Sequence, residues 1–103
     1  MIRGEVWWVE RPGFERRPHL VLTRQEVIPV LTRLLAVPAT RTVRDIPTEV
    51  ALGPEDGMPQ KCVLSLDNLA LVPKALFVER ICRLGPDRMA QVCRALALAS
   101  GCA

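Results

Sequence analysis

The chain has 103 residues, the length of a single compact domain, since such domains usually run to about 100–150 residues. Half of the residues are hydrophobic and 24% are charged, which excludes a disordered chain. The net charge is +3, and all but two of the basic residues are arginine. This bias favours a phosphate or nucleic-acid partner, because the guanidinium fork grips phosphate in bidentate fashion, although GC-rich codon usage gives the same bias.

Short apolar, β-branched segments punctuated by Gly and Pro make up most of the chain. They predict six strands, at residues 5–10, 19–23, 34–40, 48–52, 62–72 and 76–84. The fifth strand is expected to break near Asp67 and Asn68. Pro29 lies in the middle of residues 25–32, so at most one short helical turn fits there, and residues 53–60 are expected to form a loop.

The last segment changes from strand to helix periodicity. Pro86 takes the favoured first helical position and Asp87 lies in the first turn, while Gly101 is a natural stop. Many short strands and one terminal helix predict a mostly β fold, a small curled antiparallel sheet or barrel with a C-terminal α-helix. We expect residues 1–103 to form one domain.

No apolar run approaches the roughly 18 residues of a membrane span, and the N-terminal residues lack a signal-peptide core. We therefore expect a cytoplasmic protein with no membrane association. The four cysteines match no zinc pattern, so the sequence predicts no metal site and we interpret the cysteines as thiols. Cys82 and Cys93 are expected to be small core residues and Cys102 to be exposed.

The single histidine and the two tryptophans are expected to be strand residues. His19 lies in an apolar run, and nothing in the sequence supplies it with an orienting partner, so we expect no catalytic part for it. Trp7 and Trp8 are adjacent and must face opposite ways. We expect one in the core and the other beneath the helix or a dimer partner.

Four segments occur in a distinctive order. Residues 3–7 read RGEVW, residues 17–22 read RPHLVL, residues 35–50 run from LAVPAT to IPTEV, and residues 63–68 read VLSLDN. The first three resemble the R-G-[DE]-[IV]-[WY], R-P-x-[LV]-V-[IL] and V-P-x-T…P-[TF]-x-V stretches of the MazF/PemK (Kid) family of toxins. The fourth lies where that family has an acidic residue followed by Gln or Asn. The resemblance covers nearly the whole chain, including the C-terminal helix.

The resemblance implies an SH3-like, strongly curled sheet that forms a two-fold homodimer. It implies an endoribonuclease (mRNA interferase) of a type II toxin–antitoxin system, which cleaves single-stranded RNA selectively, without metal or cofactor, leaving a 2′,3′-cyclic phosphate and a 5′-hydroxyl. The implied protein partner is a MazE-type antitoxin whose disordered acidic tail lies in the RNA groove.

The family's catalytic Arg and Thr correspond to Arg17 and Thr40. The preceding loop is shorter than the family's G-S-E-Q loop, and Glu15 is the candidate for its glutamate and for a general base, with water as the alternative. RNA supplies its own nucleophile, the 2′-hydroxyl, so the protein has to position it and stabilise charge on the phosphorane. Neutralising an arginine near pH 7 costs on the order of 8 kcal/mol, so we interpret Arg17 as an electrostatic clamp, with Thr40 donating to a phosphate oxygen.

Further RNA-binding candidates are Phe14, Arg16, Arg41, Thr42, Arg44, Asp67 and Asn68. The arginines and Thr42 suit a phosphate track near two strand ends, and a solvated loop is their alternative. Phe14 could stack on a base or pack over the core. Asp67 and Asn68 could bond to base edges or simply form the turn that breaks the fifth strand.

Two other functions remain open from the sequence. One is a gyrase-poisoning toxin of the CcdB type, which shares the fold, although residues 100–103 (SGCA) lack its Trp-Gly-Ile ending. The other is a non-enzymatic SH3-like adaptor, which requires an aromatic groove. A chain with no Tyr and two Phe supplies few residues for such a groove.

Overall fold

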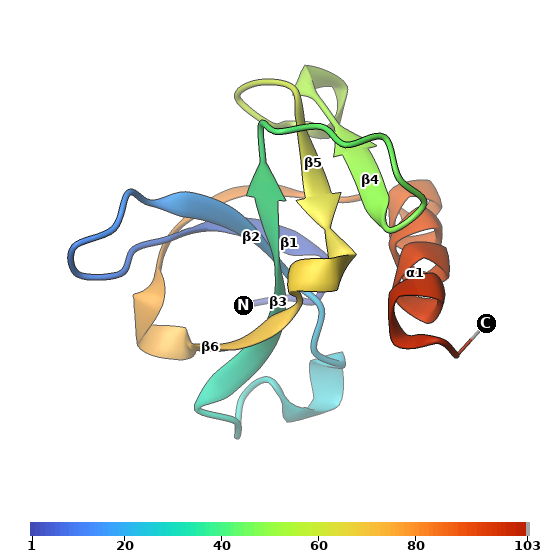
Figure 1. The fold of residues 1–103 in the computed structure, drawn as a ribbon. Helices are drawn as coiled ribbons and strands as arrows, with labels where there is room; N and C mark the ends of the chain where they lie inside the picture. Colours follow the sequence, from blue (N-terminus) through green and yellow to red (C-terminus); the bar gives the residue numbers. More distant parts are fainter. Residues whose placement is uncertain (103) are drawn as a thin grey trace.

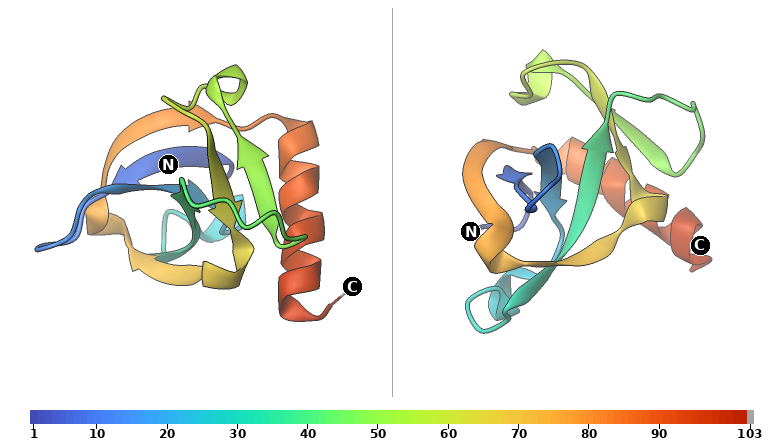
Figure 2. Two further views of the ribbon diagram at one scale, coloured as in Figure 1. Left: turned by 45° about the horizontal axis from the view of Figure 1, so that its top comes forward. Right: turned by 60° about the vertical axis from the view of Figure 1, so that its left-hand side comes forward.

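The computed structural model describes residues 1–102, in which an antiparallel sheet curls around a narrow interior and one long helix packs against its side (Figures 1 and 2). The strands are β1 (Glu5–Val9), β2 (Arg17–Val21), β3 (Arg33–Thr40), β4 (Glu49–Leu52), β5 (Cys62–Ser65), β6 (Ala70–Pro73) and β7 (Phe77–Arg83), and the helix is α1 (Pro86–Ser100). Four 3₁₀ turns, η1 (Gln25–Val27), η2 (Pro54–Asp56), η3 (Leu66–Asn68) and η4 (Lys74–Leu76), complete the described elements. The expected mostly β fold with a C-terminal helix is confirmed.

Strand β3 lies at the centre of the sheet, whose order is β4-β5-β3-β2-β1-β7. One edge of β3 pairs with β2, and the other edge pairs first with β6 and then with β5. Strands β5 and β6 are thus two parts of one extended segment, interrupted by η3 at the predicted place. Pro38 falls between the part of β3 that pairs with β6 and the part that pairs with β5, where this ladder is already interrupted and a missing N–H costs little.

Alternate side chains of the central strands enter two separate cores. Leu20 and Val37 pack with α1 and strands β4 and β5 in one core, whereas Val21 and Ala36 belong to a second core inside the curl of the sheet. Because successive side chains of a strand point to opposite faces, β2 and β3 can be buried on both sides only in a curled sheet that a helix covers. This explains why their sequences read as almost continuous apolar runs.

The helix ends as predicted, and its buried face differs from the prediction at Cys93. Gly101 adopts a left-handed conformation (φ 72°), and its N–H reaches the carbonyls of Ala97 and Leu98. The buried face is centred on Val92 and Ala95. Cys93 lies about 100° around the helix from Val92 and is exposed, so its assignment to the core is wrong.

The other cysteines follow expectation, with Cys82 buried and Cys102 exposed. Cys62, which carried no expectation, is also buried, and all four are free thiols. Within residues 1–102, no helix is long and apolar enough to span a membrane.

The first turn of the chain is fastened by Glu5, a charged residue only 6% exposed. Its carboxylate accepts hydrogen bonds from the Ile2 N–H (2.8 Å), the Trp7 indole N–H (3.2 Å) and the Arg80 Nε–H (2.6 Å). Burial alone raises the pKa of Glu5, but these donors and the positive charge of Arg80 outweigh it, so its pKa lies below the ordinary value. The contacts join the N-terminus and β1 to β7.

We predict that Glu5→Gln lowers the free energy of unfolding at pH 7 by about 1–3 kcal/mol, because it weakens charge-assisted hydrogen bonds at a buried site. Since the folded-state pKa is lowered, this stabilisation is complete above the ordinary carboxyl pKa of about 4.3 and is lost as the pH falls through the folded-state value. Urea unfolding between pH 7 and pH 2 measures the difference. The exposed Glu26→Gln is the control, and a difference that grows on acidification contradicts the prediction.

Candidate active site

A pocket of about 330 Å³ opens at one end of the sheet. It is walled by the start of β2, the end of β3, residues 58–60 of the β4–β5 loop and Cys62 at the start of β5. Arg17 and Thr40, the two predicted catalytic residues, both line it. So do four other residues with predicted roles, namely Glu15, Arg16, Arg41 and Thr42.

Strand register explains why Arg17 and Thr40 meet. Strands β2 and β3 pair antiparallel through His19 with Pro38 and Leu20 with Val37. Continuing that register by two residues places Arg17 opposite Thr40. The ladder between β2 and β3 ends at His19 and Pro38, while the other edge of β3 pairs with β5 through Thr40 and Val63. The two side chains therefore lie just past the end of the β2–β3 ladder, at the mouth of a pocket.

The hydroxyl of Thr40 is oriented by its own loop. Its oxygen accepts a hydrogen bond from the Thr42 backbone N–H at 3.2 Å. One lone pair is therefore engaged, and the hydroxyl proton is free to be donated to a ligand oxygen in the pocket. A donor fixed in this way suits a phosphate oxygen.

Arg17 and Arg16 are adjacent in sequence but differ in their surroundings. Among residues 1–102, no carboxylate forms an ion pair with Arg17, which is exposed at the pocket. Arg16 instead lies over the ring of Trp8, with its guanidinium carbon 4.3 Å from the ring centroid, and pairs with Glu79 at 3.6 Å. Arg17 is thus a cation that is available for a bound anion.

The remaining predicted residues lie outside the pocket lining. Phe14 is 75% exposed, so the alternative that it packs over the core is wrong. Asp67 accepts the Thr48 hydroxyl at 2.6 Å, and the Asn68 amide donates to the Ser65 hydroxyl at 2.8 Å. Both side chains are thereby engaged in the turn that separates β5 from β6, as their alternative interpretation states.

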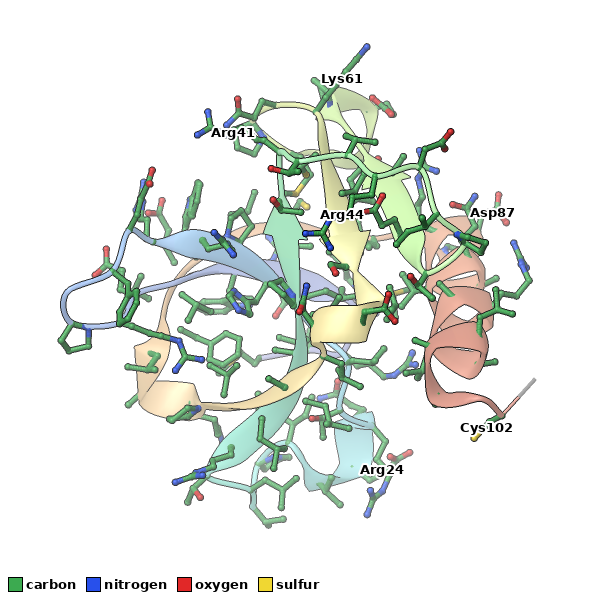
Figure 3. The ribbon with its side chains drawn as sticks, in the orientation of Figure 1. Arg24, Arg41, Arg44, Lys61, Asp87 and Cys102 are labelled. Carbon is green, nitrogen blue, oxygen red and sulfur yellow. The ribbon has the colours of Figure 1, made fainter. Side chains whose placement is uncertain are left out.

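The loop that follows Thr40 is held by Glu49 of β4. One oxygen of its carboxylate accepts the backbone N–H groups of both Arg44 and Asp45, each at 3.0 Å. Asp45 adopts a left-handed backbone conformation (φ 55°) that short polar side chains tolerate. Figure 3 shows Arg41 beyond the end of β3, at the opposite end of the molecule from Arg24.

The opposite wall of the pocket depends on a contact from α1. Arg88 donates to the Asp56 carboxylate at 3.0 Å, and that carboxylate also accepts the Gly53 N–H at 3.0 Å, which fixes η2. Gly57 follows with φ +93°, and a Cβ there would lie 2.8 Å from the Cβ of Cys82. Only glycine fits, and the turn directs residues 58–60 over the pocket.

Sequence reasoning missed several lining residues, among them Trp8, Met58 and Cys62. The sequence predicts one of Trp7 and Trp8 in the core and the other beneath the helix or a dimer partner. In the structure both are half-buried: Trp7 packs against the second core, and Trp8 belongs to neither core. Strand alternation places Trp8 on the face of Pro18, which is the signal that could have found it. Met58 carries no such signal, because long-range contacts position its loop.

His19 is buried, and its Nδ1 lies 3.1 Å from the Arg17 carbonyl oxygen. Burial lowers its pKa, and the ring does not line the pocket. For the Cys62 thiol, burial has the opposite effect and raises the pKa, and the negative charge of Asp56 raises it further. Within residues 1–102, no three His, Cys, Asp or Glu side chains are grouped to hold a metal ion.

A curled antiparallel sheet with a terminal helix and an arginine at a strand-end pocket defines the class of small β toxins that the sequence resembles. Residues 2–100 match the family described as "PemK-like, MazF-like toxin of type II toxin-antitoxin system", and the chain belongs to this family. The chain is 43% identical over 101 residues to the "Probable endoribonuclease MazF5" of Mycobacterium tuberculosis, over 97% of this chain and 93% of the relative.

Solved structures agree with the match. The "Mycobacterium tuberculosis toxin MazF-mt6" superposes with a TM-score of 0.86 at 30% identity, over 94% of this chain and 96% of that one. An "Endoribonuclease in complex with its cognate antitoxin from Mycobacterial species" gives a TM-score of 0.89 at 29% identity, over 98% and 95% of the two chains. The family match favours the toxin nuclease over the gyrase-poisoning and adaptor alternatives.

Proposed function

We propose that this chain is the endoribonuclease toxin of a type II toxin–antitoxin system, and that it cleaves single-stranded cytoplasmic RNA through the RNA's own 2′-hydroxyl. The family match and the relatives named endoribonucleases support the activity. The observation that carries the mechanism is the convergence of an unpaired Arg17 and an oriented Thr40 on one pocket.

The reaction needs one bond made and one broken. The 2′-oxygen attacks the adjacent phosphorus and gives up its proton to Glu15 or to water, while the 5′-oxygen leaves and takes up a proton. The products are a 2′,3′-cyclic phosphate and a 5′-hydroxyl. The nucleophile is already tethered to the phosphate, so the protein gains the large effective concentration of an intramolecular reaction.

Arg17 and Thr40 act on the charge that builds up on the phosphate. The Arg17 guanidinium spans two non-bridging oxygens and holds the group in line, and the Thr40 hydroxyl donates to one of them. Arg41 and Thr42 extend the polar surface along the same edge, where a backbone phosphate would follow. This scheme assigns no step to a metal ion.

We further propose that the chain acts as a homodimer and is neutralised by an antitoxin with an acidic, disordered tail. A structural relative is solved in complex with its cognate antitoxin. Leu35 and Leu71 are cross-strand neighbours on β3 and β6 and are exposed, which leaves apolar surface for a second copy. An acidic tail would complement the arginines at the pocket.

We predict that Arg17→Ala lowers kcat by about 100-fold or more, because a charged donor on the transition state is removed. Thr40→Ala removes a neutral donor and costs about 5–30-fold. Both variants should keep the wild-type circular dichroism, since neither side chain fills a core. Arg24→Ala, which removes a cation at the far end of the molecule, is the control (Figure 3). Wild-type cleavage by a folded Arg17 variant contradicts the assignment.

The mechanism itself is tested with the substrate. The cleavage motif is first read by sequencing the ends produced from a mixed RNA pool. An oligonucleotide with this motif and one deoxynucleotide on the 5′ side of the scissile bond should bind normally and remain intact, because its nucleophile is missing. EDTA should leave cleavage of the all-ribose oligonucleotide unchanged. Cutting of the deoxy substrate, or loss of activity in EDTA, rules out the scheme.

The dimer is tested by sedimentation. At micromolar concentration the chain should sediment as two copies, because exposed apolar surface on β3 and β6 becomes buried. A monomer throughout that range would disprove the proposed assembly while leaving the cleavage chemistry intact.

A further inference from the structure

The aromatic face beside the catalytic pair is formed by Trp8 on β1. Its cross-strand neighbours are Pro18 on β2 and Glu79 on β7. Arg16 lies two residues before Pro18, on the same face, and a diagonal neighbour of this kind is within reach of a long side chain. Its guanidinium is 4.3 Å from the centre of the Trp8 ring and 3.6 Å from the Glu79 carboxylate.

The position of Trp8, at the pocket and outside both cores, is one from which its ring can contact a ligand. It belongs to neither buried core and lines the same pocket as Arg17 and Thr40. The planar guanidinium over its ring shows that the aromatic face is reachable from the pocket by a flat group. A nucleobase is also a flat group that binds aromatic faces, whatever its sequence.

The contacts that hold Arg16 over the ring are weak. The ion pair joins two exposed side chains, Arg16 at 45% and Glu79 at 64%. Such pairs, and cation–π contacts at exposed sites, each shift an equilibrium by a factor of only about 2–5. Stacking of one base on an aromatic ring contributes a factor of about 5–100. The two contacts together amount to a factor of about 4–25, so a base in the upper part of the stacking range displaces Arg16 from the ring.

We propose that Trp8 is a base-stacking platform for the RNA, covered in the free protein by Arg16, which Glu79 holds in place until a base displaces it. This inference rests on the proposed nuclease function. The displaced Arg16 stays in the pocket beside Arg17, where it gains a phosphate contact. Glu79 competes with the RNA for this cation and lowers the affinity of the free toxin.

The platform is tested by steady-state kinetics on the motif-bearing oligonucleotide. Trp8→Leu keeps an apolar side chain and removes the ring, and it should raise KM about 5–100-fold with kcat within a factor of about two. Trp8→Phe keeps a smaller ring and should raise KM less. A raised KM with an almost unchanged kcat differs from the effect of Arg17→Ala, which lowers kcat. An unchanged KM for folded Trp8→Leu overturns the platform.

The role of Glu79 is tested by a charge-matched pair. Glu79→Gln should lower KM about 2–5-fold at low salt, whereas Glu26→Gln, which removes the same charge away from the pocket, should not. An unchanged or raised KM for Glu79→Gln overturns the proposal that Glu79 competes with the RNA for Arg16.

Fluorescence gives a readout that does not depend on Trp8→Leu folding. In a Trp7→Phe background, the deoxy oligonucleotide should quench Trp8 emission on binding, and absence of quenching counts against stacking. A wild-type chain that leaves all-ribose RNA intact refutes the proposed function. Normal cleavage by the wild-type chain, together with wild-type KM values for the Trp8 and Glu79 variants, refutes only this inference.

Discussion

The partner exchange of β3 is the constraint on which the rest of the molecule depends. A strand has two edges, and β3 uses one for β2 and divides the other between β6 and β5. This division curls the sheet, separates the two cores and requires a break between β5 and β6. On the edge of β3 that faces β2, the ladder ends at His19 and Pro38, just before Arg17 and Thr40, so the pocket lies where the hydrogen-bond pattern of the sheet opens.

Charge is distributed over the fold in two ways. Arg80 and Arg88 are held by the carboxylates of Glu5 and Asp56, and these pairs join β1 to β7 and the β4–β5 loop to α1. Within residues 1–102, Arg17 has no such partner. The structural arginines are neutralised, and positive potential remains at Arg17, which can bind a polyanion without first breaking an ion pair of its own.

Local signals in the sequence were sufficient for most elements. Pro86 and Gly101 mark the ends of the helix, and the polar pair Asp67 and Asn68 marks the break between β5 and β6. The exposure of Cys93 was not predictable in this way, because the buried face of an amphipathic helix is fixed by the sheet it packs on. The pocket wall at residues 58–60 depends on Arg88, which lies far along the chain and carries no local pattern.

The hydrogen bonds that Glu49 accepts from the loop after β3 affect how readily that loop adapts to a ligand. Free loops lose about 1–2 kcal/mol of backbone entropy for each residue that is fixed on binding. Here Arg44 and Asp45 are already fixed by one carboxylate, so much of that cost is met during folding. A loop fixed in advance loses little further entropy when a ligand binds, and it adapts poorly to a ligand of a different contour.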